Sequence, residues 1–171
     1  MIVGRAFCKV IDGMSINVGG STIVVKNNMG NQDALDKFIA LSDSRGEEKY
    51  PLVFFGISDV YQESNGWKSM RTKVYIMMNT REELLYKNRT DETYAKYIEP
   101  IYKELIRVLR TNPYVQVIGD NIYDKYPYTD VPNFGMSRSD VGSKTSKESV
   151  VTDYVDARVI DIDFRIKINC I

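Results

Sequence analysis

The fold is indicated most clearly by residues 157–168, ARVIDIDFRIKI, in which apolar and polar side chains alternate almost without exception. Successive side chains of a strand point to opposite faces of a sheet, so this segment predicts an antiparallel strand with one buried and one wet face. The predicted buried side chains are Ile160, Ile162, Phe164, Ile166 and Ile168, and the predicted wet ones are Asp161, Asp163, Arg165, Lys167 and Asn169. A strand this long is expected to run past its own sheet or to lie at the edge of a large one.

Three further segments are expected to be strands of the same core. Residues 52–57 are almost continuously apolar, which is typical of a central strand covered on both faces. Residues 70–78 alternate in part and follow the turn signal Asn65-Gly66. Residues 114–118 form a short apolar run that ends at Gly119, which predicts another strand.

Helices are predicted at residues 31–41, from near Arg81, and at residues 91–110. The first has one apolar stripe, with Asn31 as its candidate N-cap. The second follows a capping box that begins at Thr80. The third is the main helix, and its Pro100 is expected either to kink it or to mark its true first turn.

The two remaining regions are expected to be extensions of a single domain over residues 1–171. Residues 5–11 and 21–26 read as short strands separated by Asp12-Gly13 and Gly19-Gly20, which predicts an N-terminal hairpin or three-stranded meander within residues 1–30. Residues 120–152 lack periodicity and predict a long polar loop or arm. The core, at 31–119 and 153–171, is predicted to be α+β: a mostly antiparallel sheet of about four or five strands with two helices packed on one face.

The composition excludes several kinds of function. Lys and Arg number 23, as do Asp and Glu, so the net charge of zero excludes action by bulk positive charge on nucleic acid or anionic lipid. Histidine is absent, which excludes any mechanism or metal site that needs imidazole. Neither a signal peptide nor a membrane helix is expected. Cys8 and Cys170 do not have the spacing of metal ligands.

Three patterns could carry chemistry, and each has a more ordinary interpretation. The acidic run of Asp153, Asp156, Asp161 and Asp163 could bind Mg²⁺ in a two-metal site, but mixed charges on a solvated strand face explain it better. Gly19-Gly20 lacks the lysine and helix of a phosphate loop. Lys144 and Lys147 lie near serines, as in a Ser–Lys dyad, but a solvated loop is the commoner case. We therefore expect no catalytic residue, cofactor or metal.

The tyrosines suggest a protein interface. The chain has 12 of them, concentrated at residues 86–102 and 114–128. Tyrosines between lysines could stack nucleic-acid bases, but without a basic groove a protein interface is the better interpretation. The candidate interface residues are Tyr123, Tyr126, Tyr128 and Phe134, together with Asp161, Asp163, Arg165 and Lys167.

The order of elements resembles a known family over residues 31–168. A helix, the strand in KYPLVFF, an Asn-Gly turn, the strand in MRTKVYIMM, two helices, a strand, a polar loop and the strand in DYVDARVIDIDFRIKI follow one another. This order is similar to that of the tail-terminator and neck-ring proteins of tailed bacteriophages, especially those of phages infecting Bacteroidetes, including crAss-like phages. The resemblance implies a small α+β domain that assembles as a ring, with loops and hairpins reaching neighbouring subunits. It carries no catalytic motif.

The resemblance leads to an expected function. The chain would be a ring-forming virion subunit at the head–tail junction, in a homo-oligomer of about six or twelve copies, assembled in the host cytoplasm. Its partners would be adjacent neck, portal or tail-tube proteins, with DNA only as cargo and no membrane. The N-terminal hairpin and the loop at 120–152 would be inter-subunit arms. The alternatives are a metal-dependent nucleic-acid enzyme using the C-terminal carboxylates, and an adaptor that binds peptides at an exposed sheet edge.

Overall fold

The molecule is built on two long strands that pair along their whole length. The structure, a computed structural model, describes residues 2–40, 49–80, 84–118, 126–134 and 154–167. Strands β6 (Trp67–Asn79) and β9 (Val155–Lys167) have 13 residues each and run antiparallel, from the pair Trp67–Lys167 to the pair Asn79–Val155. The predicted alternation is confirmed over residues 160–167, because Ile160, Ile162, Phe164 and Ile166 are buried while Asp161 and Arg165 are exposed. Ala157 and Arg158 are both buried, and Ile168 and Asn169 lie outside the described residues.

Shorter strands line both outer edges of this pair. Strands β4 (Leu52–Gly56) and β5 (Val60–Ser64) both pair with β6, while β7 (Val115–Val117) and β8 (Tyr128–Val131) both pair with β9. Strand β3 (Lys26–Gly30) pairs in parallel with β4. The result is a mixed sheet of seven strands, so the expected four or five was too few. The prediction that the last strand lies at an edge was wrong, because β9 has neighbours on both sides.

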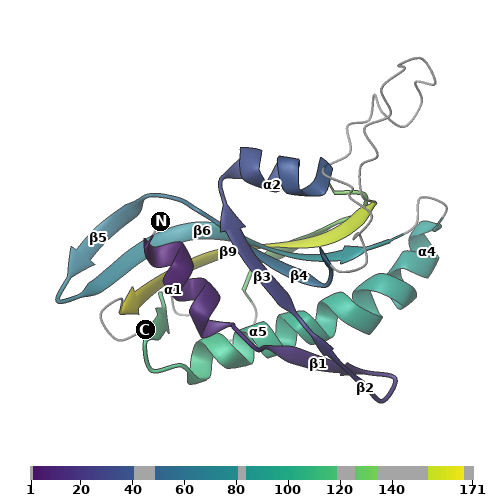
Figure 1. Ribbon diagram of the computed structural model, residues 1–171, viewed down its shortest axis with the longest axis horizontal. Coiled ribbons are helices and arrows are strands. Elements are labelled where there is room, and N and C mark those ends of the chain that lie inside the picture. The colour runs from purple at the N-terminus through teal and green to yellow at the C-terminus, as the bar shows by residue number, and fades with distance from the viewer. Residues whose placement is uncertain (1, 41–48, 81–83, 119–125, 135–153, 168–171) are drawn as a thin grey trace.

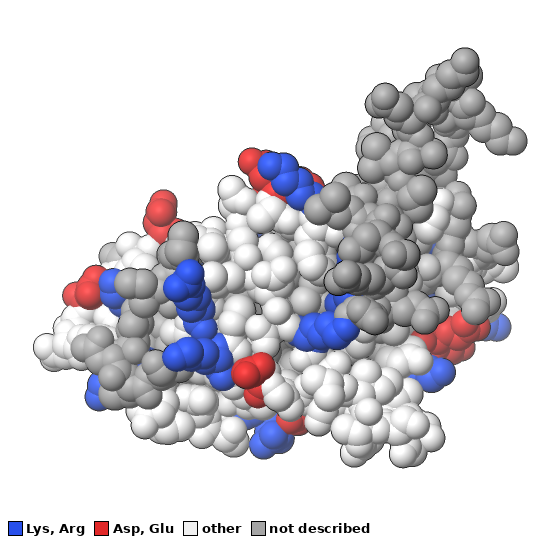
Figure 2. Space-filling model, viewed as in Figure 1, with Lys and Arg blue, Asp and Glu red and all other residues white. Residues whose placement is uncertain are grey.

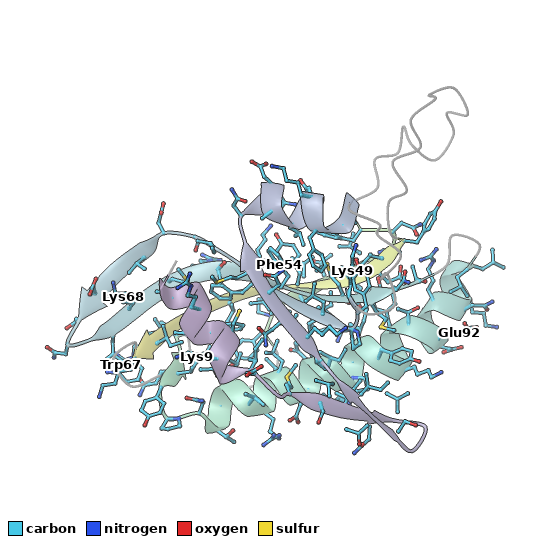
Figure 3. The ribbon with its side chains drawn as sticks, in the orientation of Figure 1. Lys9, Lys49, Phe54, Trp67, Lys68 and Glu92 are labelled. Carbon is cyan, nitrogen blue, oxygen red and sulfur yellow. The ribbon has the colours of Figure 1, made fainter. Side chains whose placement is uncertain are left out.

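Helices cover both faces of the sheet, not one face as predicted (Figure 1). Helix α1 (Ile2–Val10) packs on one face together with a long helix, and α2 (Gln32–Ala40) packs on the other. The long helix consists of α4 (Tyr86–Arg89), the π-helix η1 (Thr90–Ile98) and α5 (Glu99–Thr111), which follow one another directly. Both layers are needed because the sheet has apolar side chains on each side: Val53 and Phe55 face α1, and Phe54 lies under α2 (Figure 3).

The N-terminal segment is a helix, which corrects the strand predicted at residues 5–11. A short apolar run is compatible with the period of a helix as well as with that of a strand. Here Val3, Ala6 and Phe7 form one buried stripe on a helix. The Asp12-Gly13 dipeptide therefore ends a helix and is not a hairpin turn, since Gly13 has a φ of +72° and follows the last turn of α1. The predicted turn at Gly19-Gly20 is confirmed: it joins β1 (Ser15–Val18) to β2 (Ser21–Val24) in a separate two-stranded sheet.

Several local signals acted as predicted. The Asn31 side chain caps α2 by accepting a hydrogen bond from the Ala34 N–H at 3.0 Å. Asn65 and Gly66 both have positive φ and turn β5 into β6. Pro100 is the exception: it lies at the junction of η1 and α5, inside the continuous long helix, so it does not mark the first turn of the main helix. The Glu99 N–H just before it donates to Tyr94 five residues back, as in a π-helix.

Two predicted boundaries need correction. The helix expected to begin near Arg81 begins at Tyr86, since residues 84 and 85 are not helical and residues 81–83 are not described. The loop predicted over residues 120–152 contains strand β8, although most of that stretch lies outside the described residues. The sequence does not predict β8, because its four residues, Tyr-Thr-Asp-Val, are too few to show an alternation of apolar and polar side chains. No helix in the described ranges is both long enough and apolar enough to span a membrane.

The N-terminal helix should contribute strongly to stability through one side chain. The ring of Phe7 is fully buried and stacks on Phe55 at 4.3 Å, with Phe164 at 5.8 Å. We expect Phe7→Ala to lower the free energy of unfolding by about 3–5 kcal/mol. Cys8→Ala, one residue further and only half-buried, is the matched control and should cost less than about 1 kcal/mol. Urea unfolding of both variants measures this, and equal losses would contradict the packing of α1.

Candidate subunit interface

The aromatic residues predicted to form an interface have different environments. Tyr123 lies outside the described residues. Tyr126 is buried, and its carbonyl accepts a hydrogen bond from the Tyr102 hydroxyl at 3.3 Å, so its place is in the core. Phe134 is half-buried against Tyr75, with the ring centroids 5.5 Å apart. Tyr128 is exposed on β8 and, among the described members of this set, has the most surface to offer a partner.

The four charged residues predicted as contacts share one open face of β9. Asp161 stands opposite Lys73 of β6, and Asp163 stands opposite Arg71. Opposite charges facing each other across two strands are mutually stabilising. The two carboxylates are therefore balanced within one subunit, whereas Arg165 and Lys167 stand opposite the uncharged Ser69 and Trp67.

The far end of the same face is aromatic. The Nε of Arg165 donates to the Gln116 side chain at 2.6 Å, and its guanidinium lies 5.3 Å from the ring of Trp67. Lys167 stands opposite Trp67 in the register. Figure 3 shows Trp67 and Lys68 at the end of the sheet away from α2. Arg165 is thus held by contacts within its own subunit.

The carboxylates of this face do not form a metal cluster. In the parts of the chain that the structure describes, no three acidic or cysteine side chains come together as metal ligands. Asp153 lies outside those parts, and Asp156 is buried on the opposite face of β9. The alternative function, a metal-dependent nucleic-acid enzyme, requires a third carboxylate beside Asp161 and Asp163, and the described residues do not supply one.

A pocket of about 350 Å³ lies between α2 and the open face. It sits at the carboxyl ends of the parallel strands β3 and β4, and its walls include Phe54, Ser58, Arg71, Lys73 and Asp161. The Tyr75 hydroxyl donates to Gln32 at 3.4 Å across it, and burial raises the pKa of Tyr75, helped by the nearby Asp161 and Asp36. The two cations on its rim could hold a small anionic group.

An arginine cluster that the sequence did not reveal joins three elements. Arg158 of β9 is only 4% exposed, and its Nε and Nη2 donate to the two carboxylate oxygens of Asp130 in β8, at 2.7 and 2.9 Å. Its Nη1 donates to Glu99 of α5. The guanidinium also lies 3.9 Å from the ring of Tyr128 and 5.2 Å from that of Tyr102. This cluster fixes β8 and α5 on β9.

A second buried ion pair lies one step along the same face. Arg89 of α4 donates to Asp156 at 2.6 Å, and the Asp156 side chain is fully buried. Arg89 also donates to the carbonyl of Leu84, and the Asn133 N–H donates to Asp156. Asp156 and Arg158 lie four and two positions before Ile160 and so share its face of β9. This spacing was the one sequence signal that could have predicted that both side chains are buried.

The cysteine in the described part of the chain has a poorly reactive thiol. Burial, with a smaller effect from Asp12, raises the pKa of Cys8 to about 11. Only the thiolate is nucleophilic, so Cys8 stays protonated near neutral pH and is unsuited to covalent catalysis. Cys170 lies outside the described residues, as does any pairing between the two ends of the chain.

The exposed sheet edge expected of a peptide-binding adaptor is partly closed. The side chain of Asn28 accepts a hydrogen bond from the Met29 N–H at 2.8 Å, which occupies a donor that β3 would otherwise offer. Strand β5 changes register between Val60 and Gln62, and such a bulge disturbs pairing with an added strand. These two edges are poor templates for an extended peptide.

The β1–β2 hairpin stands apart from the main sheet. Ile16 is buried, and Val18 and Ile23 pack partly against the core that includes α5. Val24 is 60% exposed and contacts no partner sheet, since β2 pairs only with β1 in the described structure. The surface over this hairpin shows no Lys, Arg, Asp or Glu (Figure 2).

Comparison with protein-family models, curated proteins and solved structures finds no match to this chain. The fold and the geometry of its surfaces are therefore the basis for the function proposed below.

The arginine cluster predicts a specific dependence of stability on pH. Partial burial alone would raise the pKa of Glu99, but hydrogen bonding to Arg158 and the charges of Arg158 and Lys103 lower it overall. A lowered pKa means that stability is present above the ordinary glutamate pKa and is lost as pH falls through the lower, folded value. We expect the stability difference between wild type and Glu99→Gln to shrink between about pH 6 and about pH 3.

Denaturant unfolding at a series of pH values measures this difference. Glu63→Gln removes a carboxylate from the exposed pair with Lys68 and is the matched control. A difference for Glu99→Gln that stays constant below about pH 4.5 would contradict the proposed link to Arg158.

Proposed function

We propose that this protein is a ring-forming structural subunit of a tailed-phage virion, acting at the head–tail junction as a tail terminator or neck ring. Its function is structural. Identical subunits bind one another through two different surfaces and close into a ring, and the ring seals the tail or connects it to the capsid connector. The mode of assembly is a heterologous contact that closes under rotation. The adjacent neck, portal or tail-tube proteins would be its other partners.

One observation carries this proposal: the β1–β2 hairpin extends from the domain as a separate, uncharged two-stranded sheet. A two-stranded hairpin alone is marginally stable in water. Here one side is supported by the core through Ile16, while Val24 on β2 remains exposed. A hairpin of this kind gains stability when a neighbouring subunit covers it. In this proposal the N-terminal inter-subunit arm is the β1–β2 hairpin, which is shorter than the predicted arm over residues 1–30.

The rest of the domain suits a rigid ring segment. The Arg158 cluster and the Arg89–Asp156 pair tie the long helix and β8 to β9, so the body is cross-linked by buried charges as well as by its apolar core. A rigid body keeps the angle between successive subunits constant, and a constant angle is needed for a ring to close.

The open face of β9 suits a surface past which DNA moves as cargo. Each of its two carboxylates stands opposite a cation of β6, and Arg165 and Lys167 add only a modest positive excess, so the face is not strongly basic toward a phosphate backbone. A strongly basic surface would hold the DNA during passage. We assign this face to the channel, with Asp161 and Arg165 exposed and Asp163 and Lys167 half-buried along it.

The mass of the wild-type protein in solution tests this proposal. We expect size-exclusion chromatography with light scattering to give one discrete multiple of the subunit, about six or twelve, that persists on dilution. Because the proposed contact is uncharged, the mass should not change between about 0.05 and 1 M NaCl. Negative-stain images should show rings.

Two results would contradict the ring. One is a single subunit at every concentration, and the other is a mass that grows continuously with concentration, as in an open filament. Dissociation on adding salt would instead show that the subunits are joined by charges.

A further inference from the structure

Two surface segments of this protein lack charge, although 27% of its residues are charged. The longest stretches without Asp, Glu, Lys or Arg are residues 13–25, 50–58 and 111–119. The middle one forms the buried strand β4. The other two carry exposed apolar side chains: Val24 on β2, and Tyr114 and Ile118 on either side of β7, each of these two 37% exposed. Both segments therefore contribute exposed apolar side chains and no charge of their own, although Asp163, Arg165 and Lys167 of β9 lie beside β7.

Both segments also have an open backbone edge. The Val25 N–H donates to Met14, so by the alternation of an antiparallel pair the backbone groups of Thr22 and Val24 point away from β1. In β7 the Tyr114 carbonyl and the Ile118 N–H are bonded to β9, so the groups of Val117 point away from the sheet. β7 is also an outermost strand of the sheet, because it pairs with β9 on one side and with no described strand on the other.

The two segments lie at opposite ends of the molecule. β7 pairs with Phe164 to Ile166, at the end of β9 near the two chain termini, on the left of Figure 1. The β1–β2 hairpin ends at the lower right of the same view. A subunit thus cannot place this hairpin on its own β7. A contact between the two joins different surfaces of two copies, and such a contact is head to tail.

We propose that the β1–β2 hairpin of one subunit docks on β7 of the next, with β2 added as a further strand and Val24 covering Ile118. The occupant is a second copy of this chain, because an uncharged strand edge with exposed apolar side chains matches a surface of the same character. This inference rests on the proposed function, in which the subunits self-associate, and it adds the identity of the two contacting surfaces.

The test uses one aspartate on each surface. Val24→Asp damages the hairpin, and Ile118→Asp damages the surface beside β7. Leu85→Asp is the matched control, since Leu85 is 73% exposed and lies outside both segments. Light scattering should show single subunits for the first two variants at concentrations where wild type and Leu85→Asp are assembled. The concentration for half-assembly should rise more than about tenfold.

Mixing the two damaged variants gives the decisive result. The intact hairpin of Ile118→Asp can still dock on the intact β7 of Val24→Asp, while the second contact would bring two aspartates together. An equal mixture should therefore form a dimer containing one copy of each variant and nothing larger. No dimer in the mixture would overturn the proposed contact.

The outcomes separate this inference from the proposed function. An assembled wild type with both aspartate variants still assembled would overturn the contact and leave the ring. A wild type that is a single subunit throughout would overturn both. If either aspartate variant fails to fold, Val24→Cys and Ile118→Cys proteins, each with Cys8 and Cys170 replaced by serine, are mixed and oxidised. Random pairing in an equal mixture gives mixed dimers at about twice the amount of either homodimer, so the contact predicts mixed dimers well above that ratio, as for close partners with a high effective concentration. A ratio at or below the random one would overturn it.

Discussion

The antiparallel pairing of β6 with β9 is the constraint on which the rest of this structure depends. These two strands pair over their whole length, and each of them offers its outer edge to two shorter strands. Short strands are unstable without a neighbour, so β5, β7 and β8 hold their positions only because the long pair gives each of them an edge. The same pair supplies the apolar side chains, Ile160 to Ile166 on one face and Tyr75 and Met77 on the other, on which the helices pack.

Beyond the apolar part of β9, buried ion pairs hold the neighbouring elements in place. On the face of β9 that packs against the long helix, the apolar series begins at Ile160, and the two preceding positions on that face are Arg158 and Asp156. Their partners come from α5, β8 and α4, so each charge defines the position of a different element. Removing one member of such a pair typically costs about 3–5 kcal/mol, because the remaining charge is left buried without a partner. These contacts, together with the hydrogen bond from the Tyr94 hydroxyl to the Ala157 carbonyl, fix the long helix on the sheet.

The distribution of charge on the surface links the fold to assembly. On the open face of β9, Asp161 and Asp163 pair with cations of β6 across the strands. The longest exposed segments that carry no charge of their own are instead the β1–β2 hairpin and the segment around β7, at the two ends of the molecule. A subunit with apolar side chains at both ends is suited to repeated contacts with its own copies, and a net charge of zero does not oppose them.

The sequence by itself determined the features that depend on neighbouring residues: the alternation of β9, the turns at Gly19-Gly20 and Asn65-Gly66, the Asn31 cap, and the end of the long helix before Pro113. Only the tertiary structure decided whether residues 5–11 formed a helix or a strand, because a short apolar run fits both periods until Phe7 finds Phe55 and Phe164. It also decided that β9 is central and that Arg158 is inside, since burial of a charge depends on partners far away in the chain. The placement of the candidate interface followed the same division: the shared face of the four charged residues could be predicted from their spacing, whereas the isolation of the β1–β2 hairpin and the buried position of Tyr126 depend on which strands pair in three dimensions.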